Sequence, residues 1–302
     1  MYKRVLVPLD GSELSEVVFP YVRELTGRLG LDVILLHVYS LEERETAPLH
    51  RAYIERKAEI IRCQIEEVRE KIGVGPEDKP LPVRGELAEG YPAEEILRYA
   101  DENDIDLILM ATHGRSGVKR WVMGSVADKV LRASNVPVWL VRAGVTGQIA
   151  YDKWPRRTIL VPLDGSELAE AVLPHVEVLA EQRDTELVDV VLLSVAEPRA
   201  ESGYYFPNVP VTREELKEYL ARVEKRLKKL GLRVRSEVLA GKPAEQIVDY
   251  AKANPFNIIV MSTHARSGFG RWMYGSVAAK VLYHASSPIF LVRPSQSSLH
   301  QA

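Results

Sequence analysis

The sequence predicts an α/β protein with two tandem, doubly wound, five-stranded parallel sheets. The prediction rests on an internal repeat, on short apolar runs that alternate with longer helical patterns, and on strands that are apolar on both faces. The length of 302 residues suits about two domains, and 46% hydrophobic with 27% charged residues is typical of a globular protein. A net charge of −2 does not favour binding to nucleic acid or to an anionic membrane.

The repeat runs through both halves of the chain in the same order. Residues 4–14 (RVLVPLDGSEL) return at 158–168 as TILVPLDGSEL. Residues 112–117 (THGRSG) return at 263–268 as THARSG. We therefore predict one domain at 1–143 and a second at 157–294, joined by a linker that holds Gly144, Gly147 and Pro155.

The elements of the first half follow from hydrophobic periodicity. Strands are predicted at 4–9, 32–39, 81–87, 106–112 and 136–142, and helices at 12–29, 51–72, from Pro92 onward and at 124–133. Proline suits the first position of a helix, because the N–H group there has no helical partner. The alternation of strand and helix requires right-handed crossovers and therefore a parallel sheet.

The second half repeats this order with an insertion. Its second helix is predicted at 212–230, after a segment at 201–210 that holds the aromatic residues Tyr204, Tyr205 and Phe206. That segment is expected to serve an interface or to cover a second site. The single cysteine, Cys63, lies among apolar residues of a predicted helix, so we expect a packed thiol and no internal disulfide.

The loop after the fourth strand carries the clearest chemical signal. It combines three glycines, at 114, 117 and 124, with the basic residues Arg115, Lys119 and Arg120. Gly124 and Ser125 then open a helix, whose free N–H groups and dipole favour an anion such as phosphate. The alternative is a surface loop with a simple Gly-Ser cap. Gly241-Lys242 is followed by Pro243, so no Walker A loop is formed, and no G-x-G-x-x-G follows the first strand.

At these residues the chain resembles the universal stress protein family, UspA type, whose ATP-binding members carry G-2x-G-9x-G-[ST] at this place. The first copy reads Ala111-Thr-His-Gly114, nine residues, then Gly124-Ser125. The second reads Ser262-Thr-His-Ala265, nine residues, then Gly275-Ser276. The resemblance implies a Rossmann-like, adenine nucleotide alpha hydrolase-like fold. Because the second copy has lost two glycines and the first only one, we expect the second site to bind more weakly or to be empty.

The resemblance also implies which residues contact ATP, AMP or ADP. Adenine would lie near the strand ends, Asp10 would contact the ribose or sit near the phosphates and a divalent cation, and the loop and helix start would bind the phosphates. Mg²⁺ would arrive with the nucleotide, since no metal-ligating cluster is visible. In the first half these residues are Pro8, Leu9, Asp10, Val38, Met110, Ala111, His113, Gly114, Arg115, Gly124, Ser125 and Val126. In the second half they are Pro162, Leu163, Asp164, Val195, Met261, Ser262, His264, Gly275, Ser276 and Val277.

Several of these residues have simpler interpretations that stay open from the sequence. Asp10 and Asp164 are also suited to cap a helix through an Asp-Gly-Ser turn. The valines and methionines on strands, such as Val38 and Met110, are equally suited to a plain core. The histidines are also suited to bonds with loop backbone.

No nucleophile elbow or kinase signature is present, so we predict no catalytic residues. The favoured function is a stress-responsive, adenine-nucleotide-binding regulatory or sensor protein without efficient turnover. The alternatives are a slow Mg-dependent ATPase or phosphotransfer enzyme, and a nucleotide-free dimeric interaction module. We further expect an internal pseudo-dimer through the last strand of each half, a possible homodimer, no nucleic-acid or membrane partner, and a cytoplasmic location.

Overall fold

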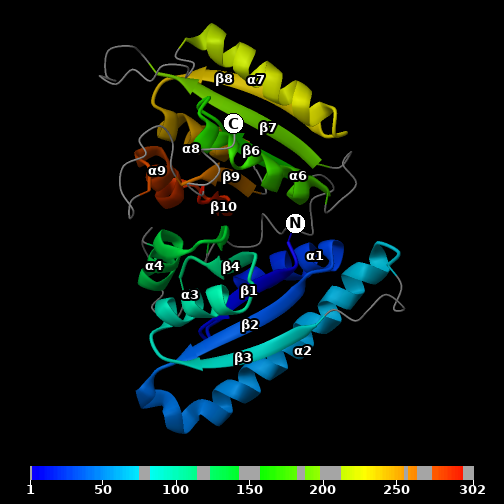
Figure 1. Ribbon diagram of the computed structural model, residues 1–302, viewed down its shortest axis with the longest axis vertical. Coiled ribbons are helices and arrows are strands. Elements are labelled where there is room, and N and C mark those ends of the chain that lie inside the picture. Colours follow the sequence, from blue (N-terminus) through cyan, green and yellow to red (C-terminus); the bar gives the residue numbers. More distant parts are fainter. Residues whose placement is uncertain are drawn as a thin grey trace. The chain divides into compact units, whose positions relative to one another are not determined.

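The computed structural model describes residues 2–74, 82–113, 123–142, 157–181, 188–197, 212–254, 258–263 and 274–294. The chain divides into two compact units, residues 1–153 and 154–302 (Figure 1). Each unit is an α/β domain with its own parallel sheet, as the sequence predicts. No helix in the described part of the chain has both the length and the hydropathy to cross a membrane.

The sheet of the first unit has the strand order β3-β2-β1-β4-β5, and all four pairings are parallel. β1 and β4 pair only at Val5–Leu107 and Leu6–Ile108. Beyond that point their carboxyl ends diverge, which opens the crevice typical of a doubly wound sheet where the strand order reverses. The five strands are β1 (Arg4–Leu9), β2 (Asp32–Tyr39), β3 (Val83–Glu89), β4 (Leu107–Ala111) and β5 (Val138–Val141).

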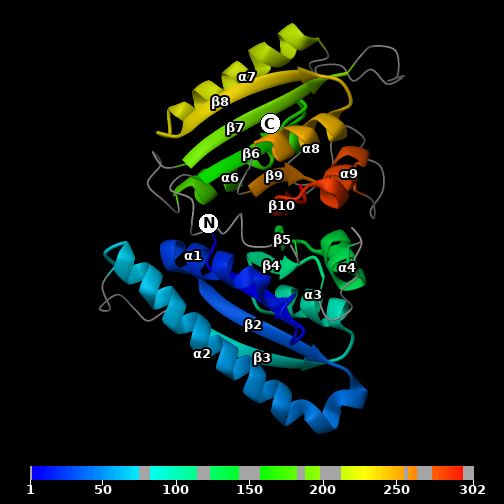
Figure 2. The same cartoon turned by 180° about the vertical axis from the view of Figure 1, so that it is seen from behind.

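Helices cover both faces of this sheet. α1 and α2 pack together on one face, and α3 and α4 pack together on the other (Figures 1 and 2). Because both faces are covered, β1, β2 and β4 are apolar and almost wholly buried along their central residues. The helices are α1 (Phe19–Leu29), α2 (Ala47–Lys71), α3 (Pro92–Glu102) and α4 (Ser125–Ala133), with short 3₁₀ helices η1 (Glu16–Val18) and η2 (Leu41–Thr46).

The second unit has the same topology, with the order β8-β7-β6-β9-β10 and parallel pairing throughout. β6 and β9 pair at only two positions, Ile159–Ile258 and Leu160–Ile259, as β1 and β4 do in the first unit. The strands are β6 (Arg157–Pro162), β7 (Val188–Ala196), β8 (Arg233–Ala240), β9 (Ile258–Ser262) and β10 (Ile289–Val292). The helices are α5 (Glu167–Glu170), α6 (Leu173–Glu181), α7 (Arg213–Lys228), α8 (Pro243–Ala253) and α9 (Ser276–His284).

Several predicted boundaries are wrong. The helix expected at 12–29 begins as an α-helix only at Phe19, because side chains of Asp10, Ser12 and Ser15 bond the backbone of the preceding turn and compete with helix formation. The helix expected at 51–72 begins at Ala47, next to Pro48 in its first turn. The third strand runs to Glu89 rather than to residue 87, because its ladder with β2 extends to Tyr39–Glu89.

The expected burial of Cys63 is also wrong, since the thiol is exposed. The buried stripe of α2 contains Ile61 and Ile65, and a residue two positions after Ile61 points away from that stripe. The insertion at 201–210 with its three aromatic residues lies outside the described residues.

Candidate functional site

A pocket of about 330 Å³ lies over the carboxyl ends of β1, β2 and β4 and the first turns of α3 and α4. Its walls contain every first-half residue of the predicted site that the structure describes. Gly114 and Arg115 lie outside the described residues, as do Lys119 and Arg120. The ten predicted residues that line the pocket are Pro8, Leu9, Asp10, Val38, Met110, Ala111, His113, Gly124, Ser125 and Val126.

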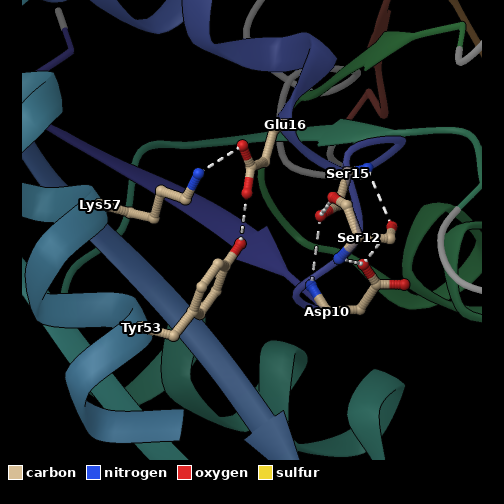
Figure 3. Close-up of polar contacts among 6 residues, drawn as sticks. All are labelled: Asp10, Ser12, Ser15, Glu16, Tyr53 and Lys57. Carbon is tan, nitrogen blue, oxygen red and sulfur yellow. Dashed lines mark hydrogen bonds and ion pairs between the residues drawn. The ribbon is translucent and has the colours of Figure 1, made fainter. Parts of the chain in front are cut away.

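Asp10 forms a tight turn at the end of β1. Its Oδ1 accepts hydrogen bonds from the backbone N–H of Ser12 at 3.0 Å and from the Ser12 hydroxyl at 2.6 Å. Gly11 between them has a φ of 86°, a conformation that glycine adopts without strain. The hydroxyl of Ser15 donates to the Ser12 carbonyl and accepts from the Asp10 N–H, which closes the turn (Figure 3). The simpler interpretation of Asp10 as a turn residue therefore holds, and the same carboxylate also lines the pocket.

Glu16, directly after this turn, ties it to α2. Its Oε1 accepts a hydrogen bond from the Tyr53 hydroxyl at 2.9 Å, and its Oε2 lies 2.6 Å from the Lys57 ammonium group (Figure 3). About a quarter of the Lys57 side chain is exposed (25%), so the ion pair is partly shielded from water. The segment that carries Asp10 is thus held against the helix layer.

The junction between β4 and α4 presents free backbone donors to the pocket. The Gly124 N–H donates to the Thr112 carbonyl at 2.9 Å, and the helix ladder starts with the Asp128 N–H bonding the Gly124 carbonyl. The N–H groups of Ser125 and Val126 therefore have no helical partner. Among the described residues no side chain caps this terminus, and the N-cap residue itself, Gly124, has no side chain. A Cβ at Gly124 would lie 3.0 Å from the Thr112 carbonyl oxygen, so glycine permits this close approach.

His113 lies beside this junction. Its Nδ1 is 3.1 Å from the Thr112 hydroxyl, while its Nε2 is buried and has no hydrogen-bond partner among the described residues. Burial, with a smaller contribution from the Arg142 charge, lowers the pKa of the imidazole. A buried nitrogen without a hydrogen-bond partner is uncommon in folded proteins, so His113 is a candidate for a role beyond packing.

The opposite end of the pocket is formed by the segments after β2 and β3. Val38 is half-buried there, and the buried His37 bonds the Leu9 carbonyl through Nδ1 at 2.9 Å, which joins β2 to the end of β1. The Gly90 N–H bonds the Tyr39 carbonyl at 3.0 Å. The two segments are thereby held together at the rim.

Nine lining residues were missed by the sequence analysis. Ser40 and Glu43 carry a recognisable signal, since Ser-x-x-Glu before a helix is the pattern of a capping box. Backbone and apolar contributors such as Gly90 and Ile96 carry none. The full set is Ser15, Leu36, Ser40, Glu43, Gly90, Pro92, Ile96, Thr112 and Ala127.

Strand residues of the predicted site serve the core as well. Met110 and Met261 are both only 5% exposed, although Met110 also contributes to the pocket wall. The core interpretation and the site interpretation are compatible here, because the upper end of a buried strand forms the floor of the crevice.

The corresponding residues of the second unit reproduce the turn and the helix junction. Asp164 Oδ1 accepts from the Ser166 N–H at 3.0 Å and from the Ser166 hydroxyl at 2.6 Å. The Gly275 N–H donates to the Thr263 carbonyl at 2.8 Å. Pro162 and Leu163 lie at the end of β6, Val195 on β7, Met261 and Ser262 on β9, and Ser276 and Val277 start α9, whereas His264 lies outside the described residues. Among the described residues, no His, Cys, Asp and Glu side chains gather into a group of three or more that would hold a metal ion.

Known proteins resemble this chain over nearly its whole length. A universal stress protein of Mycobacterium tuberculosis is 23% identical over 298 residues, covering 96% of this chain and 97% of that protein. One from Methanocaldococcus jannaschii is 32% identical over 157 residues, covering 47% of this chain and 96% of that protein. The crystal structure of a universal stress protein from Archaeoglobus fulgidus shares the fold, with a TM-score of 0.66, 18% identity and 97% of each chain covered.

The model of the universal stress protein family matches the chain twice, at residues 1–142 and at residues 155–293. Both matches contain the Asp-Gly-Ser turn and the Gly-Ser helix start described above. The chain therefore belongs to the universal stress protein family, with two copies of its domain in tandem.

Proposed function

We propose that the first domain binds an adenine nucleotide in the pocket over β1, β2 and β4, and that the chain acts as a stress-responsive regulatory or sensor protein without efficient turnover. One observation carries the proposal. The N-terminus of α4 opens into a pocket that His113 also lines and whose remaining wall is largely apolar. Such a pocket suits a ligand that has an anionic group at one end and a flat apolar ring at the other.

The residues present fit the parts of a nucleotide. The N–H groups of Ser125 and Val126 would donate to phosphate oxygens, and a side chain at Gly124 would block their approach. Leu9, Val38 and Met110 would enclose the adenine ring. Asp10, between these two ends, would contact the ribose or lie near the phosphates. The pocket of about 330 Å³ is within the range of small-molecule sites.

Binding without efficient turnover is part of the proposal. Hydrolysis requires a positioned water and stabilisation of the charge that develops on the transferred phosphoryl group. Asp10 is a carboxylate in the pocket, but its Oδ1 already accepts two hydrogen bonds from Ser12. We expect Mg²⁺ to be held mainly by the phosphates of the nucleotide and to shield their charge.

We propose a weaker or empty site in the second domain. Its turn and helix junction match those of the first domain, but its loop has Ala265 where the first has Gly114. A methyl group there would crowd the phosphates or resist a turn that requires glycine. The pairing of the two domains through β5 and β10, and a homodimer of the whole chain, remain predictions. Light scattering coupled to size-exclusion chromatography would measure the oligomeric state.

The decisive experiment is mass spectrometry of small molecules released from the denatured, purified protein, followed by calorimetric titration of the nucleotide-free chain with ATP. We expect about one tightly bound adenine nucleotide per chain. Two equal sites, or occupancy of the second domain alone, would contradict the ranking. No bound nucleotide and no heat on titration would contradict the proposal itself. Mg²⁺-dependent release of ADP that is lost in Asp10→Ala would instead favour a slow ATPase.

A further inference from the structure

The helices α2 and α7 occupy the same place in the two domains but differ in charge. Each joins the second strand of its sheet to the third and packs against that third strand, α2 on β3 and α7 on β8 (Figures 1 and 2). Toward their C-terminal ends, the exposed residues of α2 are mainly acidic and those of α7 are mainly basic. The repeat therefore places opposite charges on two corresponding surfaces.

The acidic stripe of α2 consists of Glu66, Glu67 and Glu70, which are all exposed. None of the three forms an ion pair with another described residue, and Arg62, one turn before Glu66, donates to the Val83 carbonyl at 2.9 Å. Glu70 lies one turn after the other two glutamates, where like charges on a helix repel each other. The C-terminal end of a helix also carries a partial negative charge, which disfavours acidic residues. The helix itself therefore disfavours this stripe.

The basic stripe of α7 consists of Arg222, Lys225 and Lys229, which are all exposed. Their spacing of three and four residues places them on one face of the helix. None of them forms an ion pair with another described residue, whereas their neighbours Arg226 and Lys228 each pair with a glutamate. A surface hollow of about 430 Å³ lies beside Lys225 and Lys229, with Ala221 in its wall. Side chains of another molecule have room to enter there.

Other helices of the described chain pair their charges internally. Arg28 lies 3.0 Å from Glu24, and Arg132 lies 2.8 Å from Asp128, each pair one turn apart. The two stripes depart from this arrangement in opposite directions, and each has the charge that the other lacks. Such complementary surfaces favour association and fix which surfaces meet.

We propose that the acidic stripe on α2 of one chain docks against the basic stripe on α7 of a second copy. A nucleic acid or an anionic membrane would use only the basic stripe and would leave the acidic stripe unexplained, whereas a second copy accounts for both. The net charge of −2 allows two chains to approach without strong repulsion. The contact is independent of nucleotide binding and involves neither β5 nor β10.

The first test measures the mass of the full chain by size-exclusion chromatography with light scattering, in about 0.1 M and about 1 M salt. These salt concentrations screen charges beyond about 10 Å and about 3 Å. We expect two or more chains to associate at low salt, increasingly with protein concentration, and to separate at high salt, because the contact joins exposed charges. A chain that stays monomeric at low salt overturns the inference.

Charge reversal then identifies the two stripes. One variant carries Glu66→Lys and Glu70→Lys, and the other carries Lys225→Glu and Lys229→Glu. Each variant should weaken self-association on the order of 10-fold or more, since its facing stripes have like charge. An equal mixture of the two variants should associate again, because every stripe then meets its opposite on the other chain. If mixing does not restore association, the stripes do not face each other and the inference is wrong.

The matched control carries Glu245→Lys and Asp249→Lys on α8. Both residues are exposed and lie one turn apart, so the control changes the net charge by the same amount at the same spacing as the first variant. Its self-association should equal that of the wild-type protein, and circular dichroism should show intact folding of every variant. An equally large loss in the control would show that net charge, and not the acidic stripe, governs association.

Cys63 reports on the acidic stripe directly. It is exposed, is the only cysteine of the chain, and lies three residues before Glu66 on the same face of α2. At low salt, alkylation of wild-type protein by iodoacetamide should slow as the protein concentration rises. In the variant with Lys225→Glu and Lys229→Glu, which leaves α2 unchanged, the rate should not depend on concentration. A rate independent of concentration in the wild-type protein would show that α2 lies outside the contact.

A polyanion is the other possible occupant of the basic stripe. If the wild-type chain is monomeric at low salt and binds a labelled single-stranded oligonucleotide or phosphatidylserine vesicles through Lys225 and Lys229, the stripe serves an anionic partner and the inference is wrong. Nucleotide binding by the first domain is measured separately by calorimetry, so the proposed function stands or fails independently of these outcomes.

Discussion

The carboxyl edges of the two sheets are alike in backbone geometry and different in the side chains above it. The Asp10 and Asp164 turns have the same two hydrogen bonds at 3.0 and 2.6 Å, and the N-cap glycines Gly124 and Gly275 bond the preceding threonine carbonyls at 2.9 and 2.8 Å. Above this shared frame, the buried His37 that bonds the Leu9 carbonyl is replaced by a serine in the second domain.

This difference shows which interactions tolerate change. Ser194 donates to the Leu163 carbonyl at 2.6 Å, so a smaller side chain fulfils the same bond. The aromatic pair Tyr21–Trp139, with ring centroids 5.8 Å apart, likewise corresponds to His175–Phe290 at the same separation. Satisfying buried backbone groups constrains the turn and the helix start closely, whereas an aromatic contact with the same ring separation is made by different residues in the two domains. Equivalent folds therefore do not imply equivalent sites.

The largest difference in ATP binding is expected between substitutions of the two N-cap glycines, Gly124 and Gly275. Gly124→Val would place its Cβ 3.0 Å from the Thr112 carbonyl oxygen and cover the amides offered to phosphate. Loss of several charge-assisted hydrogen bonds should weaken ATP binding on the order of 100-fold. The tight binding of ATP that calorimetry measures should be absent in Gly124→Val and present in the matched variant Gly275→Val. Equal losses from both variants would show that the two sites are equivalent.

Substitutions of Asp10 and Asp164 should have similar effects on the stability of the protein but different effects on nucleotide binding. Asp10→Ala and Asp164→Ala each remove an acceptor of two hydrogen bonds, and each should cost about 1–2 kcal/mol in the free energy of unfolding by urea. Only Asp10→Ala should also weaken ATP binding. The variants Asp10→Asn and Asp164→Asn keep the turn acceptor and control for the fold. If Asp164→Ala weakens ATP binding as much as Asp10→Ala, the asymmetry between the domains is wrong.

Acid should destabilise the second domain through His175. Burial lowers the pKa of this imidazole from 6.5 to about 4. Below pH 6.5 the unfolded chain takes up a proton that the folded domain does not accept until about pH 4, so stability falls across this window and is fully present above it. The free energy of unfolding by urea should differ less between pH 7 and pH 5 in His175→Tyr than in the wild-type protein. Tyrosine is the residue at the corresponding position of the first domain, Tyr21. An unchanged pH effect would rule out His175 as its source.

The smallest effect is expected at the ion pairs beside the two turns. Lys57 lies 2.6 Å from Glu16 with side chains 25% and 20% exposed, whereas Arg226 lies 3.4 Å from Glu170 with side chains 52% and 31% exposed. Lys57→Met should destabilise α2 by up to about 1 kcal/mol, and Arg226→Met should destabilise α7 by a few tenths at most. Hydrogen exchange of the two helices measures both. If Arg226→Met destabilises its helix more than Lys57→Met does, shielding from water does not determine which ion pair contributes more to stability.

The candidate site was predictable where a residue type has one strong physical reason to occupy its place. Gly124 was found because a glycine followed by serine opens a helix, and Asp10 because it follows the first strand, at the carboxyl edge where ligands of such sheets bind. Glu43 was missed although Ser40 and Glu43 form a capping-box pattern, since nothing in the sequence shows which helix start faces the crevice. Gly90 and Ile96 reach the pocket only through the packing of α3, and their residue types are common elsewhere.

The sequence by itself determined the duplication, the order of strands and helices, and the Asp-Gly-Ser turn and Gly-Ser helix start of each half. These follow from local patterns, because periodicity and turn residues act over a few neighbours along the chain. Only the tertiary structure decided that Cys63 faces solvent, that the third strand extends along β2 to Glu89, and that Glu43 and His113 line the same pocket. Contacts of this kind join residues far apart in sequence, so they depend on how the elements pack and not on any segment alone.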